Sequence, residues 1–390
     1  MLSSHVKLSL PEKLSEQELG AWLIINACHL TETGLPLESL LDVYPVILKV
    51  VQTMPKMSRR RLIQLAATAF VLGDVPLPPA EHVSAEQRVQ LHHSLGENIA
   101  AGWKLFHTAG NEQVLAVSYA QLYLLHQVSS ELYPSVRPLL YSSVYNLIGA
   151  AKHFQGRYEE AYQAHERAYI GALEGIDVLS MAQSRTWQAN GLREQRRYRE
   201  ALQVFEVAHR LISQRNDIES IRLRAHLLAA EAESAAFLGE SEVVQKNLDA
   251  SELLLERLPS TYVEEFDHAS WHQYAGTCAL ILEQYDRAVQ ELQHAIQTLP
   301  PNWLMRYATA LMPLAIAYAR LREREKCLDI VEKAAQVLQE MHSPSLNQQF
   351  VGYLEQEIQV AFPGDLSIST STTRIQQQIM ASMNAPTLIN

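Results

Sequence analysis

The feature that most constrains this chain is an internal repeat in its middle. The twenty residues from Gly149 read GAAKHFQGRYEEAYQAHERA, and the twenty from Ala189 read ANGLREQRRYREALQVFEVA. The shared positions are Tyr158, Ala161, His165 and Ala168 in the first copy, and Tyr198, Ala201, Phe205 and Ala208 in the second. A unit that recurs at a fixed period predicts stacked supersecondary units, each packed against its neighbours.

Further copies follow the same pattern with decreasing clarity. The third copy begins at Gly276 and carries Tyr285, Ala288, Leu292 and Ala295. Looser copies lie between the second and third, with Ser241 in the tyrosine position, and after the third, with Arg324 there. A small residue stands in the first half of the best copies, and spacings of 3, 4 and 3 put the second-half residues on one helix face. Each copy therefore predicts two antiparallel helices in close contact.

These residues resemble the tetratricopeptide repeat (TPR), whose pattern runs small residue, aromatic, alanine, aromatic, alanine and a closing proline, here Pro300. The copies lie about 39 to 44 residues apart rather than the 34 of that family. This longer period resembles the repeat half of bacterial helix-turn-helix transcriptional regulators. The resemblance implies an all-α, right-handed superhelical solenoid of antiparallel helix pairs. It also implies a non-catalytic scaffold that binds a peptide or partner protein on its concave face, as the sensing or interaction part of a bacterial regulatory system.

Composition changes along the chain divide it into three parts. Residues 1–80 contain amphipathic patterns and end at the proline-rich GDVPLPPAEHVS, so we expect a helical segment that caps the repeats. Residues 81–362 are the repeat domain. Residues 363–390 are rich in serine and threonine, which predicts a flexible tail.

The resemblance also implies which side chains face a ligand, because concave positions flank the small residue of each first helix. Residue by residue, these positions are Asn146, His153, Gln183, Asn190, Arg193, His226, Glu233, Gln273 and Arg320. Asn190 is the foremost candidate, since an amide side chain can donate to and accept from a peptide backbone together. Trp187 and Tyr274 are candidate aromatic anchors on the same face, with packing in the core as the alternative.

Charge and motifs exclude several other classes. The formal net charge of −11 leaves no basic footprint for nucleic acid, and no apolar run reaches the length of a membrane span. The sequence has no GxSxG, no HExxH and no glycine-rich phosphate loop, so we expect neither an enzyme nor a cofactor. The three cysteines are isolated from one another, which favours the cytoplasm. The expected partner is a protein or peptide.

Two alternatives remain open at this stage. His268 and His272 lie four residues apart with Glu264 and Glu265 nearby, a spacing that a metal-binding or enzymatic helical protein could use. The second alternative is export, because Arg59, Arg60 and Arg61 precede an apolar run in a pattern similar to a twin-arginine leader. The same run also has the spacing of a helix that packs on the first repeat, which is the interpretation we prefer.

Overall fold

The computed structural model describes residues 85–108, 111–127, 132–259, 266–300, 303–341 and 344–384. The predicted capping segment 1–80, including Arg59 to Arg61, lies outside the described residues. Among the described helices, none is long and apolar enough to cross a bilayer.

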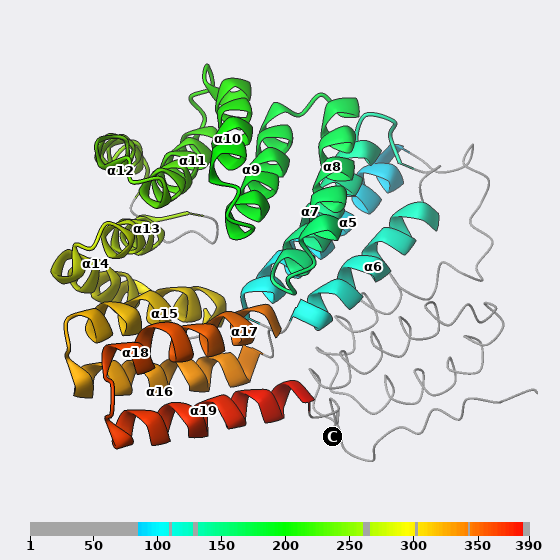
Figure 1. The fold of residues 1–390 in the computed structure, drawn as a ribbon. Coiled ribbons are helices and arrows are strands. Elements are labelled where there is room, and N and C mark those ends of the chain that lie inside the picture. The colour runs from blue at the N-terminus through cyan, green and yellow to red at the C-terminus, as the bar shows by residue number, and fades with distance from the viewer. Residues whose placement is uncertain are drawn as a thin grey trace, which may run out of the picture.

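The described residues form helices that follow one another in antiparallel pairs and include no strand (Figure 1). The pairs are α5 (Ala85–Thr108) with α6 (Asn111–Gln127), α7 (Arg137–His153) with α8 (Tyr158–Glu174), α9 (Val178–Glu194) with α10 (Tyr198–Ile212), α11 (Ile218–Phe237) with α12 (Ser241–Leu255), α13 (His268–Ile281) with α14 (Tyr285–Thr298), and α15 (Leu304–Arg320) with α16 (Arg324–Met341). This confirms the predicted fold class, an all-α solenoid of TPR-like helix pairs.

The repeat pattern marks where each second helix begins. Tyr158, Tyr198 and Tyr285 are the first residues of α8, α10 and α14. The two weaker copies behave in the same way, because α12 begins at Ser241 and α16 at Arg324. Behind these first residues the predicted stripe is fully buried: Ala201, Phe205, Ala208, Ala288, Leu292 and Ala295 are all 0% exposed. Local pattern therefore determines both the helix boundaries and the packed face.

The turn inside five of the pairs has one conformation that recurs along the described residues. The residue two positions before α8, α10, α12, α14 and α16 has a positive φ: Gly156, Arg196, Gly239, Glu283 and Arg322, with φ between 59° and 76°. In the α9–α10 turn the Arg197 amide donates to the Leu192 carbonyl, which ends α9 in a left-handed cap. The recurrence of this turn shows that the degenerate copies are true members of the array.

Close approach between paired helices depends on the small residues of the first helix. A Cβ added at Gly276 would lie 2.5 Å from Leu292 Cγ and 3.1 Å from Leu292 N, whereas one added at Gly352 meets nothing within 4 Å. We expect Gly276→Ala to lower the free energy of unfolding, because overpacking costs about 1–3 kcal/mol and exceeds the helix-propensity gain of about 1 kcal/mol. Gly352→Ala is the matched control and should raise stability by about 0.5–1 kcal/mol. Urea denaturation measures both, and a stabilised Gly276→Ala variant would contradict the close approach.

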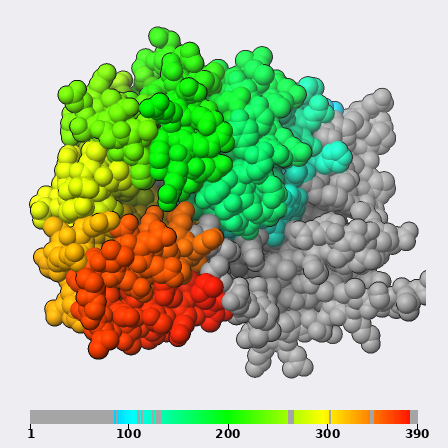
Figure 2. Space-filling view, viewed as in Figure 1, coloured from blue at the N-terminus to red at the C-terminus, as the bar shows by residue number. Residues whose placement is uncertain are grey.

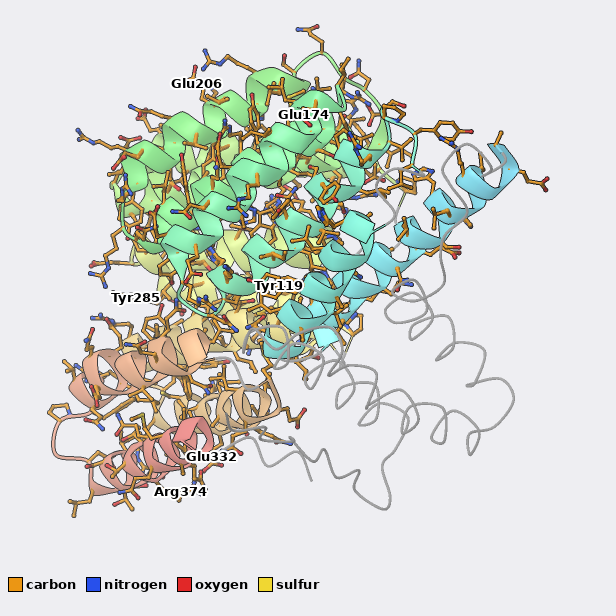
Figure 3. All side chains as sticks on the ribbon, turned by 90° about the vertical axis from the view of Figure 1, so that its right-hand side faces the viewer. Tyr119, Glu174, Glu206, Tyr285, Glu332 and Arg374 are labelled. Carbon is orange, nitrogen blue, oxygen red and sulfur yellow. The ribbon has the colours of Figure 1, made fainter. Side chains whose placement is uncertain are left out.

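The C-terminal residues differ from the flexible tail expected for 363–390. After α17 (Pro344–Tyr353), the π-helical turn η3 (Leu354–Ile358) and α18 (Gln359–Ala361), residues Leu366–Asn384 form α19. Ile368, Ile375 and Ile379 are at most 2% exposed, and Arg374 forms an ion pair of 2.8 Å with Glu332 of α16 (Figure 3). Ser367, Ser369, Thr370 and Thr373 of this helix are exposed, and its polar composition drew attention away from the spacing of the isoleucines. Thus α17 to α19 add a seventh helix pair that the repeat pattern did not predict.

The array is curved strongly enough that helix pairs far apart in the sequence come into contact. His107 at the end of α5 stacks on Trp303, just before α15, with ring centroids 4.4 Å apart. Gln349 of α17 donates a hydrogen bond of 3.3 Å to Glu194 of α9, a contact between residues 155 positions apart. In the space-filling view the orange C-terminal residues adjoin the green central ones (Figure 2). These contacts bring the first and third helix pairs against the last part of the described array, beside the concave face.

Candidate functional site

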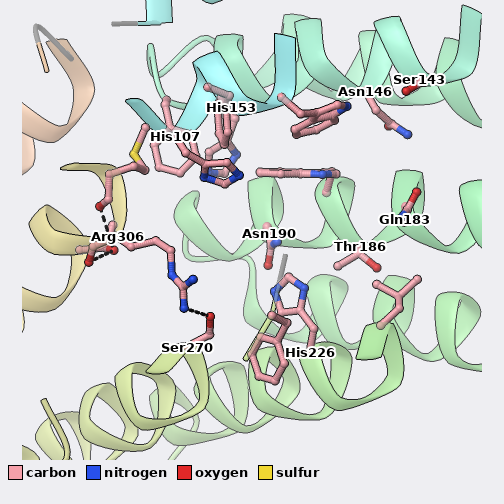
Figure 4. Close-up of a pocket in the computed structure, with 18 of the residues that line it drawn as sticks. His107, Ser143, Asn146, His153, Gln183, Thr186, Asn190, His226, Ser270 and Arg306 are labelled. Carbon is pink, nitrogen blue, oxygen red and sulfur yellow. Dashed lines mark hydrogen bonds between the residues drawn. The ribbon is translucent and has the colours of Figure 1, made fainter. Parts of the chain in front are cut away.

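The concave face contains a pocket with a volume of about 620 Å³. Its walls come from the first helices of the pairs, α5, α7, α9, α11, α13 and α15, and α17 contributes Leu346 and Gln349. Figure 4 shows His107, His153, Asn190, His226 and Arg306 arranged around this one space. Pockets for small ligands commonly have volumes of about 300–1,000 Å³. The cavity is therefore large enough for a small molecule or a short stretch of peptide.

Most of the predicted ligand positions meet in this pocket. Those that line it are Asn146, His153, Gln183, Trp187, Asn190, Arg193, His226 and Gln273. Tyr274, the second candidate anchor, also lines it. The grouping follows from the alignment of the repeats, since equivalent positions of successive first helices face the same side. That these residues bind a ligand stays a prediction.

Two predicted positions lie elsewhere. Glu233 on α11 lies behind the lining, where its carboxylate is 2.9 Å from Arg193 Nη1. Arg320 is exposed at the end of α15 and forms an ion pair with Glu357 in η3. Glu357 belongs to the seventh helix pair, which no copy of the repeat pattern indicated, so this contact of Arg320 was not predicted.

An aromatic wall forms one side of the pocket. Trp103 and Phe106 of α5 lie against Trp187 of α9, with ring centroids 6.3 Å and 6.1 Å from it. His165 of α8 stacks behind Trp187 at 5.7 Å with its plane tilted by 6°. Both alternatives considered for Trp187 therefore apply in part: one side of its ring packs against His165, and the ring also lines the pocket.

Five buried polar atoms of the lining find no hydrogen-bond partner among the described residues: His107 Nδ1, Arg193 Nε, Arg193 Nη1, His153 Nδ1 and Asn190 Oδ1. His153 and Asn190 are 6% and 7% exposed, respectively, and line the pocket from α7 and α9. A buried polar atom left unpaired costs about 1–3 kcal/mol, which a ligand that pairs with it can recover. In contrast, the Asn146 amide has a partner at each end: its nitrogen donates to Ser184 Oγ, and its oxygen lies 3.1 Å from His165 Nδ1.

The histidines around the pocket are neutral at physiological pH. Burial lowers the pKa of His153 and of His226 to about 4, and that of His165 to about 3. Burial, assisted by the nearby Arg306 charge, lowers the pKa of His107 to about 4 as well. These rings therefore contribute aromatic surface and hydrogen-bonding nitrogens rather than positive charge.

The two buried arginines of the lining are already paired with carboxylates. Arg193 lies 2.9 Å from Glu233, with its guanidinium 5.7 Å from the centre of the Tyr274 ring. Arg306 Nη2 donates to Asp267 Oδ1 at 2.5 Å and to Ser270 Oγ. Asp267 also caps α13 by accepting from the Ser270 amide. Each guanidinium thus has a carboxylate of the protein within 3 Å, while Nε and Nη1 of Arg193 donate no hydrogen bond to any described residue.

Several lining residues were not predicted, and they come from α5, α15 and α17. Trp103, Phe106 and His107 belong to a helix whose repeat pattern is weak, and Arg306 lies one turn before the small residues of α15. The aromatic run GWKLFHT, from Gly102, was the available signal in the first of these helices.

The rival metal site at His268 and His272 gains no support from the described residues. His268 is exposed, whereas His272 Nδ1 lies 2.7 Å from Glu291 Oε2 and its ring lies 4.1 Å from that of His294. Within the described ranges, no group of three or more histidine, cysteine, aspartate or glutamate side chains could hold a metal ion. Glu264 and Glu265 lie outside these ranges.

Comparison with known proteins finds similar solved structures at low identity. No protein family model matches the chain, and no curated protein matches it in sequence. The apo form of the quorum sensor NprR from B. thuringiensis is 14% identical over 95% of this chain and 99% of that chain, with a TM-score of 0.44. The APC/C hetero-tetramer Cut9-Hcn1 is 13% identical over 85% and 66%, with a TM-score of 0.38. The TPR domain of P58(IPK) is 11% identical over 75% and 99%, with a TM-score of 0.21. Similarity at this level says nothing of what the chain binds, so the function has to follow from the pocket.

Proposed function

We propose that this chain is a non-catalytic scaffold that binds a peptide, or a peptide segment of a partner protein, in the pocket of its concave face. We further propose that it is the sensing or interaction part of a regulatory system. The resemblance of its long repeats to bacterial regulators supports this second step. The observation that carries the first step is the unpaired, buried polar pair at His153 and Asn190 inside a pocket of about 620 Å³.

A peptide backbone supplies what this polar pair lacks. Its N–H can donate to Asn190 Oδ1, and a neighbouring backbone group can pair with His153 Nδ1, which donates or accepts according to the ring tautomer. Both side chains are held by rigid helices, α7 and α9, so little conformational freedom is lost on binding. The first helices of six pairs line the pocket, so the protein can contact several side chains of a ligand at once.

We expect Asn190→Ala to weaken peptide binding by about tenfold, because each lost buried hydrogen bond is worth about 1–1.5 kcal/mol. The same variant should unfold at the same urea concentration as wild type, or a higher one, because Asn190 Oδ1 makes no hydrogen bond that the variant loses. The measurement is calorimetric titration with peptides selected from a displayed library of random hexapeptides on the wild-type protein.

Gln163→Ala is the matched control, since it removes an exposed amide from the convex helix α8. It should leave the affinity of the selected peptides unchanged. Selection of peptides whose affinity is the same for wild type, Asn190→Ala and Gln163→Ala would place binding outside the pocket and overturn the proposal. A destabilised Asn190→Ala variant would point to a structural role for this side chain instead.

A further inference from the structure

The charges and rings that line the pocket specify the chemistry of its ligand. We propose that the pocket selects an uncharged peptide segment with an aromatic side chain, and discriminates against both acidic and basic segments. This inference rests on the proposed function, because it concerns the same pocket and names the class of peptide.

An acidic side chain would compete with carboxylates of the protein for the two arginines in the interior of the pocket. Arg193 is held by Glu233 and Arg306 by Asp267, and the side chains of both arginines are only 11% and 10% exposed. A ligand carboxylate bound at either arginine would lie close to the carboxylate already paired with it, and like charges brought together cost several kcal/mol. Lys104, the third basic residue of the lining, is exposed to solvent, where its charge is hydrated and screened.

A basic side chain is disfavoured by the same arrangement. Glu194 accepts a hydrogen bond from Gln349 and lies 3.7 Å from Arg193, whose positive charge opposes the approach of a ligand ammonium. A lysine of the ligand would also lie near the guanidinium groups of Arg193 and Arg306 and would lose its hydration on entry. Like charges brought together at an interface suppress the wrong partner.

The uncharged part of the lining favours an aromatic ring. Trp103, Phe106 and Trp187 form a continuous wall, with Phe106 edge-on to Trp187 at 86° and Trp103 stacked with it at 26°. His153 lies 6.0 Å from Trp187 at 69°, which places the unpaired Nδ1 of His153 next to this wall. A ligand aromatic ring can therefore pack on the wall while its own backbone pairs with His153 and Asn190. Aromatic pairs contribute about 0.5–1.5 kcal/mol beyond the area they bury.

The test uses four pentapeptides, Gly-Ser-X-Ser-Gly, acetylated and amidated at their ends, with phenylalanine, leucine, aspartate or lysine as X. We expect the phenylalanine peptide to bind at least about tenfold more tightly than the aspartate and lysine peptides in calorimetric titration. The leucine peptide should bind with intermediate affinity. In the Trp103→Leu variant the preference for phenylalanine over leucine should be lost, whereas Tyr119→Leu, at an exposed aromatic position on α6, should retain it.

The outcomes separate this inference from the proposed function. If the aspartate or lysine peptide binds most tightly and loses affinity in Asn190→Ala, the pocket binds peptides but the inference on charge is wrong. The inference also fails if library-selected peptides bind while the phenylalanine peptide does not. If the phenylalanine peptide binds equally to wild type and to Asn190→Ala, the ring is held outside the pocket, and the inference is again overturned.

Discussion

Acidification from pH 6.5 to pH 4.5 is expected to destabilise the folded protein steeply. His107, His153 and His226 have a pKa of about 4 in the fold, and His165 has a pKa of about 3. The ordinary value for histidine is 6.5. Each buried histidine should therefore remove roughly 1.4 kcal/mol of unfolding free energy per pH unit within this interval.

The sign follows from proton binding. Below pH 6.5 the unfolded chain binds a proton at each of these histidines, whereas the folded protein keeps the rings neutral until the pH approaches 4. Protonation thus favours the unfolded chain, so the stability is fully present above pH 6.5 and is lost as the pH falls towards 4. Burial is the main cause, and the positive charge of Arg306 adds to it at His107 and that of Arg193 at His226.

Urea denaturation at pH 7.5, 6.0, 5.0 and 4.5 measures this slope. His226→Gln should reduce the slope by the contribution of one histidine, roughly 1.4 kcal/mol per pH unit. His268→Gln is the control, because it removes a histidine at an exposed position of α13 without altering the pocket. A stability that stays constant between pH 7.5 and pH 5.0 would show that water reaches these rings in the folded state.

The helix pairs could be predicted because the signals that specify them are local. Tyr158, Tyr198 and Tyr285 mark the beginning of a helix, and the alanines three residues later mark its packed face. Alignment of the repeats also predicted that Asn146, His153, Asn190 and other pocket residues lie on the same side of the array. Equivalent positions share a face whatever the exact curvature of the array, so this grouping needed no knowledge of the tertiary structure.

The features that could not be predicted follow from the curvature of the whole array. That curvature is the sum of small rotations between successive helix pairs. The contact of His107 with Trp303 joins residues almost 200 positions apart, and no local pattern indicates that the first and sixth pairs meet. The aromatic wall contributed by α5 and the paired state of Arg306 follow from that curvature. The isoleucines of α19 were overlooked for another reason, since polar composition was given more weight than the spacing of Ile368, Ile375 and Ile379.

The second large effect should come from the ion pair between Arg193 and Glu233. Burial alone would lower the pKa of Arg193, but Glu233, Tyr274 and Glu194 together outweigh this effect and raise the pKa. Glu233→Leu removes one of the two carboxylates and leaves a buried guanidinium without its main partner, which typically costs about 3–5 kcal/mol. We expect a loss of this size in the free energy of unfolding, whereas Asp329→Ala, which breaks the exposed pair with Lys333, should cost less than about 1 kcal/mol.

The double variant Arg193→Leu with Glu233→Leu distinguishes the charge from the packing. Replacing both members of a buried pair by apolar side chains is often neutral for stability, so the double variant should recover most of the loss seen in Glu233→Leu. Because the neutral pocket keeps its aromatic wall and its Asn190 oxygen, the phenylalanine pentapeptide should still bind to the double variant. If the double variant is as unstable as Glu233→Leu, packing around α11 rather than the unpaired guanidinium accounts for the loss. The two outcomes differ by several kcal/mol in the same denaturation experiment, which makes this pair the most sensitive probe of how the charges inside the solenoid are balanced.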